Sequence, residues 1–345
     1  MPRVDGLTER QARVLQTIVQ QYIETAEPAG SSAVARRCRL GISSASVRNT
    51  MGELETGGYL FHTHASSGRI PTDRAYRAYV DGLMRHEPPS ELERERLASE
   101  VVVVTGGAIE EILRRAAQVL GVLTQELGVA VAPVLDQAVL ERLELVRVSS
   151  ERLLVVLTLE SGFMRTIFLE VPSTVATEEV ERVARVLNER LAGLPLGEIR
   201  ASVAERLRDA DGSREGSRLF NVFVEQREGV FDARPDGGLL LGSSQQLADQ
   251  PEFASKDRMR SLLELTERRD LLQSALDAHR QRGLTITIGA ENRDPSLSEF
   301  TLVTASYRRG ELTGVVGVLG PTRMPYDKVI GLVEHTSRLV EGLLT

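Results

Sequence analysis

The sequence has very few residues that could crosslink the chain or anchor it in a membrane. Cys38 is the only cysteine among 345 residues. A disulfide within the chain is therefore impossible and a cysteine-based zinc site cannot be built, and both absences fit the cytosol. No run of about 18 apolar residues occurs, and the first eleven residues lack the apolar core of a signal peptide. We therefore expect a cytoplasmic protein without a membrane span.

The motifs of common enzymes are also missing. The sequence has no Walker loop, no G-x-S-x-G elbow and no H-E-x-x-H motif. Gly314, Gly317 and Gly320 recur along an expected strand, where close packing explains them better than a dinucleotide loop does. His62 and His64 share one face of a strand, the one pattern that fits a metal, but no acidic or cysteine partner is near. We expect no enzyme, no cofactor and no metal.

Charge is unevenly divided along a chain whose net charge is −7. Residues 1–87 hold 11 Arg against 9 acidic residues, a balance of +2, which leaves −9 for the remainder. Within residues 31–77 the count is 7 Arg against 3 acids, or +4. A mildly basic head on an acidic body is typical of a DNA-binding domain attached to a regulatory or oligomerising part.

Local patterns in the first 85 residues predict three short helices followed by a β-hairpin. Thr8 and Gln11 form a possible capping box before an apolar helical repeat that Pro28 ends. Ser31 or Ser32 is expected to cap a second helix, and Ser43 or Ser44 a third that ends at Gly57-Gly58. A β-prone segment at 59–64, a turn at 66–68 and a helix capped by Thr72 follow. This is the order of elements in a winged helix-turn-helix.

The third helix carries the residue types that read DNA. Small residues at its start allow close approach to DNA, and its free amides can receive a phosphate. Arg48 can bond guanine and Asn49 adenine, because both side chains form paired hydrogen bonds with base edges in the major groove. Arg69, beside the hairpin turn, and Arg74 and Arg77 behind it are placed to meet the DNA backbone. The candidate DNA-binding residues are Ser44, Ala45, Ser46, Arg48, Asn49, His64, Ser67, Gly68, Arg69, Arg74 and Arg77.

The rest of the chain predicts an α+β domain with an antiparallel sheet and an interruption. After a Pro- and charge-rich linker comes an amphipathic helix with apolar residues from Ile109 to Leu127. Expected strands are 143–148, 153–159, 163–171, 284–288, 300–307 and 312–319, and expected helices are 178–192, 260–279 and 329–344. Strands on both sides of the less periodic segment 195–260 suggest one domain with an insertion.

Several motifs in order resemble the HrcA family of heat-inducible transcription repressors, from about residue 7 to the C-terminus. They are Ser46–Asn49, Gly58–Leu60, His64–Asp73, Tyr76–Asp81, Gln250–Phe253, Ile288-Gly289 and Gly320–Tyr326. The resemblance implies a winged-helix domain (1–86), a linker (87–104), a GAF-like domain (105–194 and 261–345) and an inserted dimerising domain (195–260). It also implies a homodimer on an inverted-repeat operator of double-stranded DNA before chaperone operons, with repression dependent on the GroE chaperonin.

Two alternatives remain open from the sequence. One is a winged-helix repressor of metabolic genes that responds to a small ligand, which a cluster of buried polar residues would favour. The other is an enzyme with a DNA-binding head, which would need an acid–base pair or a phosphate loop.

Overall fold

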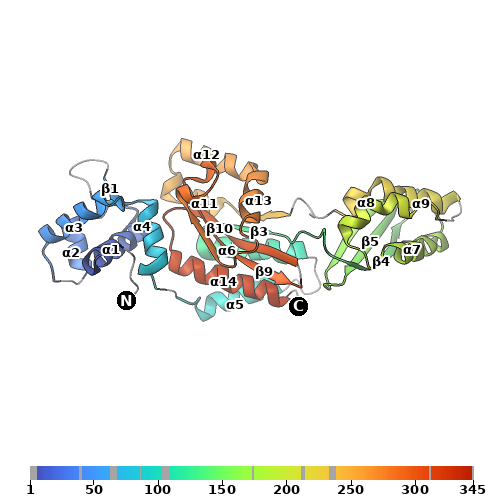
Figure 1. Ribbon diagram of the computed structural model, residues 1–345, viewed down its shortest axis with the longest axis horizontal. Helices are drawn as coiled ribbons and strands as arrows, with labels where there is room; N and C mark the ends of the chain where they lie inside the picture. Colours follow the sequence, from blue (N-terminus) through green and yellow to red (C-terminus); the bar gives the residue numbers. More distant parts are fainter. Residues whose placement is uncertain are drawn as a thin grey trace.

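Three groups of elements follow one another along an elongated molecule (Figure 1). This computed structural model describes residues 6–38, 41–62, 68–85, 87–102, 109–172, 175–210, 214–232, 238–310 and 312–343. It is an α+β protein in which all strand pairs among these residues are antiparallel. We call the three groups the N-terminal unit, the central unit and the distal unit.

The N-terminal unit (residues 6–85) has the expected order of three helices and a hairpin. Its elements are α1 (Glu9–Thr25), α2 (Ser31–Arg37), α3 (Ser44–Thr56), β1 (Leu60–Phe61), β2 (Ile70–Pro71), α4 (Asp73–Ala78) and the π-helical turn η1 (Tyr79–Leu83). The capping box of Thr8 and Gln11 is confirmed, as are the caps at Ser43 and Thr72. The expected cap at Ser31 or Ser32 is wrong: Gly30 occupies that position without a side-chain bond, because the helix already begins at Ser31.

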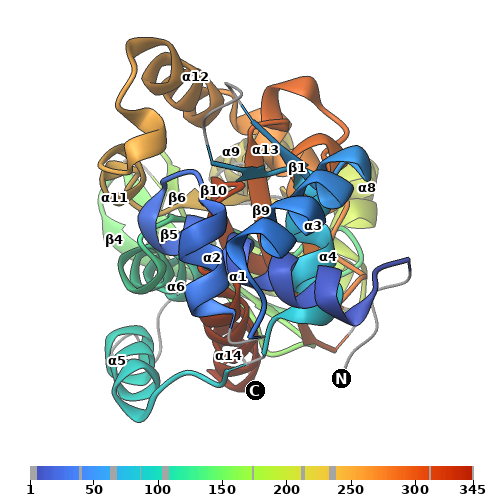
Figure 2. The same cartoon turned by 90° about the vertical axis from the view of Figure 1, so that its left-hand side faces the viewer.

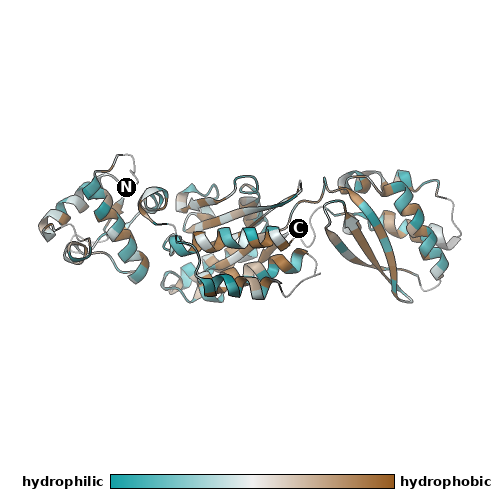
Figure 3. Cartoon of the chain, turned by 90° about the horizontal axis from the view of Figure 1, so that it is seen from below, coloured by the Kyte–Doolittle hydropathy of each residue, from teal (hydrophilic) through white to brown (hydrophobic). Residues whose placement is uncertain are grey.

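The central unit is a five-stranded sheet with helices on both faces (Figures 1 and 2). Its strand order is β7 (Leu239–Leu241), β3 (Leu127–Val131), β10 (Leu312–Pro321), β9 (Phe300–Arg309), β8 (Thr285–Ile288). One face carries α5 (Glu91–Val102), α6 (Ile109–Thr124) and α14 (Tyr326–Leu343), and the other α11 (Gln245–Ala248), α12 (Lys256–Glu267) and α13 (Arg269–Asp277). Seen from the side of α5 and α14, hydrophilic and hydrophobic colours alternate along the helices of that face (Figure 3), as expected where one helix face is buried.

The distal unit is a three-stranded meander with helices on one face. Its strands are β4 (Leu140–Ser149), β5 (Arg152–Leu159) and β6 (Met164–Glu170), and its helices α7 (Thr177–Leu191), α8 (Leu196–Arg206), α9 (Arg214–Glu225) and α10 (Arg227–Val230). Alternate residues of β5, from Leu153 to Leu159, are fully buried toward the helices. The strands expected here, and the helix expected at 178–192, are confirmed.

The expected single sheet is wrong, because the two sets of strands form separate sheets. The central sheet is completed by β3, a strand that is buried at every position and so lacks the alternation that marks a half-exposed strand. The expected insertion at 195–260 is divided between two units: α8 and α10 pack with the distal helices, whereas β7 pairs with β3. The expected helix at 260–279 is also two helices, α12 and α13, which meet at Arg268.

The segment expected to be a linker, 87–104, contains the whole of a packed helix, α5. Leu97 and Val101 of α5 are fully buried, and α5 contacts both α6 and α14. Hydrophobic burial therefore makes this helix part of the central unit.

Candidate nucleic-acid interface

Helix α3 divides its side chains between the interior and solvent as the sequence predicts. Val47, Met51 and Leu54 are at most 3% exposed and pack in the core of the N-terminal unit. The opposite side at the start of the helix is exposed and consists of Ser44, Ala45, Arg48 and Asn49, with Ser46 half-buried. Four of the candidate residues thus share one surface.

The start of α3 is suited to an anion. The Ser43 Oγ atom accepts a hydrogen bond from the Ser46 backbone N at 3.2 Å, and the first turn contains no acidic residue. Because the first amides of a helix lack intrahelical partners and sit at the positive end of its dipole, they attract phosphate or another anion. Within the described part of the chain, Arg48 forms neither an ion pair nor a hydrogen bond through its side chain, so its guanidinium is available to a ligand.

The hairpin is fixed to the rest of the N-terminal unit by the residue before its second strand. Arg69 and Ala29 exchange two backbone hydrogen bonds of 2.9 Å. A Cβ atom at Gly68 would lie 2.5 Å from the Pro28 carbonyl oxygen, so only glycine allows this close approach. The candidates His64 and Ser67 lie outside the described residues.

Glu55, which the sequence reasoning missed, joins α3 to the hairpin. Its carboxylate pairs with the Arg69 guanidinium at 2.9 Å and with the His62 ring. The expectation that no acid lies near His62 is therefore wrong, since Glu55 comes from the preceding helix. The described residues contain no group of three His, Cys, Asp or Glu side chains that could hold a metal.

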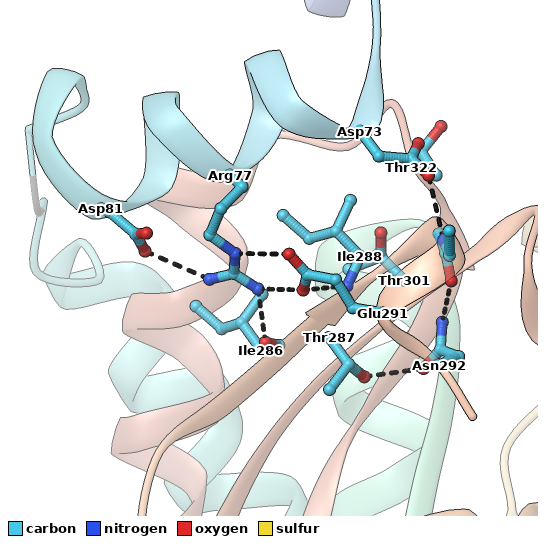
Figure 4. Close-up of polar contacts among 12 residues, drawn as sticks. Asp73, Arg77, Asp81, Ile286, Thr287, Ile288, Glu291, Asn292, Thr301 and Thr322 are labelled. Carbon is cyan, nitrogen blue, oxygen red and sulfur yellow. Dashed lines mark hydrogen bonds and ion pairs between the residues drawn. The ribbon is translucent and has the colours of Figure 1, made fainter. Parts of the chain in front are cut away.

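The two arginines behind the hairpin occupy different environments. Arg74 is exposed, stacks over the Tyr59 ring at 4.5 Å and donates to the Gly57 carbonyl at 2.8 Å. Arg77 faces the central unit, where it donates to Glu291 and to the Ile286 carbonyl (Figure 4). Hydrogen bonds from Arg77 to Glu291 raise the pKa of Arg77 above its ordinary value despite partial burial. The structure therefore separates Arg77 from the exposed start of α3.

A cavity of about 540 Å³ lies beside the edge strand of the central sheet, between α13 and the loop after β8. His279, at its inner side, bonds the Thr304 hydroxyl at 2.9 Å, and burial lowers the pKa of His279 to about 4. Among the described residues, no lining side chain has a buried polar atom without a partner.

Known proteins match this chain along almost its whole length. Residues 110–330 match the family model described as the HrcA protein C-terminal domain. Heat-inducible transcription repressors HrcA of Chlorobium phaeobacteroides (strain BS1) and Geobacter sulfurreducens are 38% and 35% identical, over 95% and 98% of this chain and 96% and 98% of theirs. These relatives are transcription repressors and not enzymes.

A solved crystal structure of a hypothetical protein has the same fold. It covers 99% of both chains with a TM-score of 0.72 at 23% identity. None of the helices in the described part of this chain is both long and apolar enough to cross a membrane. With the family model matching well over half of the residues, the chain belongs to the HrcA family of heat-inducible transcription repressors.

Proposed function

We propose that this repressor acts in the cytoplasm as a homodimer that binds an inverted-repeat operator before chaperone genes, with activity dependent on the GroE chaperonin. The observation that carries the DNA-binding part is the exposed start of α3, where Arg48 and Asn49 project from a helix whose other side is packed in the core. An exposed helix with this chemistry fits the major groove.

The N-terminal unit fits a winged helix-turn-helix, with α3 as the recognition helix and β1–β2 as the wing. Arg48 and Asn49 then contact base edges, while the amides at Ser44, Ala45 and Ser46 receive a phosphate. We assign Gly68, Arg69 and Arg74 to contacts with the DNA backbone, together with His64 and Ser67, which fall between β1 and β2 in the sequence. Arg77 can join them only if its bonds to Glu291 open.

The proposed dimer uses the distal unit. The face of its sheet that the helices leave open carries Val146, Val148, Met164 and Phe168, which are between 48% and 55% exposed. The register places Val146 and Phe168 on either side of Leu154, so these three side chains form one row across the sheet. An antiparallel sheet facing water is normally polar on that face, whereas an apolar one supports a two-fold contact with a second copy.

The proposed roles in DNA binding and dimerisation divide the chain into three domains. We assign residues 1–86 to DNA binding and the central sheet with its helices on both faces to a GAF-like domain. The inserted dimerising domain then consists of β4–β6 with α7–α10, in place of the segment 195–260. The dependence on GroE rests on the family resemblance. The relatives are named heat-inducible transcription repressors, which supports regulation by heat.

Footprinting of the purified chain on chaperone promoters of its own genome tests the proposal. We expect protection of two half-sites related by a two-fold axis, with no protection of promoters of unrelated genes. Protection of metabolic promoters instead, appearing only with a small molecule, would favour the ligand-responsive alternative.

A further inference from the structure

The N-terminal unit contacts the central unit through side chains that come from distant parts of the chain. Helix α4 supplies Asp73 and Arg77 to the loop after β8, and the loop before α14 supplies Arg323 to the end of α1. These contacts join residues 214, 217 and 300 positions apart. The chain passes from the N-terminal unit to the central unit once, in the residues before α5. Those described in 84–90 form no regular helix or strand.

The first contact is the pair of Arg77 and Glu291 (Figure 4). The Arg77 Nε atom donates to Glu291 at 2.8 Å and its Nη2 atom to the same carboxylate, so the pairing uses both carboxylate oxygens. The Nη2 atom also donates to the Ile286 carbonyl at 2.7 Å, and Nη1 to Asp81 at 3.1 Å. The Ile288 backbone N donates to Glu291 at 2.9 Å and fixes the carboxylate. Such a paired geometry defines an orientation as well as a distance.

Asp73 also contacts the loop after β8, and its side chain packs directly against the loop backbone. The Asp73 carboxylate accepts a hydrogen bond from the Ala290 backbone N at 3.0 Å. Gly289 has φ +52°, and a Cβ atom there would lie 2.0 Å from the Asp73 Oδ2 atom. The loop therefore fits α4 only with glycine at this position.

The second contact is Arg323 at the end of α1. Its Nη1 atom donates to the Ile23 carbonyl at 2.6 Å, and its other nitrogens bond both oxygens of Glu252, one of them at 2.9 Å. The last turn of α1 contains no basic residue of its own. Arg323 thus brings a positive charge from the central unit to the negative end of that helix. Its side chain and that of Glu252 are both only 14% exposed.

An aromatic contact lies between these polar ones. Tyr76 of α4 and Tyr326 at the start of α14 have ring centroids 5.9 Å apart, and both rings are buried. Two paired arginines and a buried aromatic contact hold the N-terminal unit in one orientation more firmly than a single crossing of the chain would.

We propose that Arg77 and Arg323 are positioning residues for operator binding, which set the half-site spacing that the dimer reads by fixing the N-terminal unit on the central unit. This inference rests on the proposed function, because spacing matters only when two α3 helices bind one operator. The separation and orientation of the two recognition helices determine which half-site spacing a dimer accepts. A unit that could rotate freely would accept several spacings.

The test removes the two partner carboxylates and leaves the N-terminal unit unchanged. The variant is Glu252→Ala with Glu291→Ala. The matched control is Glu299→Ala with Glu334→Ala, which breaks two exposed ion pairs within the central unit, to Arg258 at 3.8 Å and Arg338 at 4.0 Å. Binding is measured on the footprinted operator and on duplexes whose half-sites are separated by about 5 more base pairs, half a helical turn.

We expect the wild type and the control to prefer the native spacing, and the variant to lose that preference by about fivefold or more, the lower range of measured coupling between sites. An unchanged preference in a folded variant overturns the inference. A wild type that does not distinguish the operator from scrambled DNA rejects the proposed function instead. If the double variant does not fold, Glu291→Ala alone is measured, with the same two outcomes.

A measurement without DNA tests the fixed orientation independently. Spin labels are placed at the exposed positions Glu27 and Gln118, the second on α6 of the central unit, in a Cys38→Ser background because Cys38 is the one native thiol. We expect one narrow distance distribution between the labels of a protomer in the wild type and the control, and a broader one in the variant. Equal widths in all three proteins would overturn the inference.

Discussion

Replacing Phe168 with alanine tests the proposed dimer face. Phe168 is 55% exposed on the open face of the distal sheet. Full burial of a side chain of this size contributes about 1.5–3 kcal/mol, so covering the exposed half contributes about 0.8–1.5 kcal/mol. Because a two-fold contact contains the residue twice, Phe168→Ala should weaken the dimer by about 1.5–3 kcal/mol, or raise its Kd about 10- to 150-fold.

Sedimentation equilibrium over a range of protein concentrations measures this Kd directly. The matched control is Leu263→Ala on α12, a side chain that is 52% exposed in the central unit. Thermal unfolding of both variants checks that the distal sheet stays folded. A dimer that is unaffected by Phe168→Ala, or one that dissociates equally in Leu263→Ala, would refute the assignment of the face.

Three further predictions concern stability and regulation. Gly289→Ala should destabilise the chain by about 1–2 kcal/mol or more, because it combines a left-handed backbone with a clash against Asp73. Asp73→Ala in the same chain should recover part of this loss in equilibrium unfolding, and no recovery would contradict the close fit. Burial lowers the pKa of His279 to about 4, so the unfolded chain binds its proton more readily and stability should fall as the pH drops below about 6.5, by about 2 kcal/mol at pH 5. His279→Gln should lack this part of the pH dependence in denaturant titrations, and an identical pH profile would argue against it. Mild heating should abolish operator binding and chaperonin with ATP should restore it, whereas binding that survives heating and ignores chaperonin would reject the GroE dependence.

Sequence patterns predicted the elements whose signals are local. The capping box at Thr8 and the caps at Ser43 and Thr72 mark helix starts that the structure confirms, because each depends on residues three positions apart. The outward position of Arg48 and Asn49 was predictable for the same reason, since helical periodicity alone separates them from Val47.

The assignment of strands to sheets could not be predicted in the same way. The strands near residues 143–171 and 284–319 were located, but their partners depend on contacts far apart in the sequence. Strand β3 was not predicted: its first residue, Leu127, was assigned to the amphipathic helix before it and the rest to no element, because the strand is apolar without alternation and follows α6 closely. Without β3, the two sheets could not be distinguished.

The environment of Arg77, a candidate site residue, could not be predicted from the sequence either. Its spacing behind the hairpin favours a contact with DNA, but its carboxylate partner Glu291 lies 214 residues further on. The motifs around Gly289 and Arg323 identified the family without indicating what they do. Only the fold shows that both lie against the N-terminal unit.

The central claim, that α3 reads the operator, is tested most directly by titrating Arg48→Ala on operator and scrambled duplexes at several salt concentrations. The matched control is Arg36→Ala, which removes the same charge from the exposed side of α2. We predict that Arg48→Ala costs about 1–3 kcal/mol per half-site on the operator and little on scrambled DNA. We predict that Arg36→Ala leaves the ratio of the two affinities unchanged, because any contact it makes with phosphate carries no sequence information. Equal losses on both duplexes for Arg48→Ala, or no loss at all, would contradict the assignment of α3 as the recognition helix.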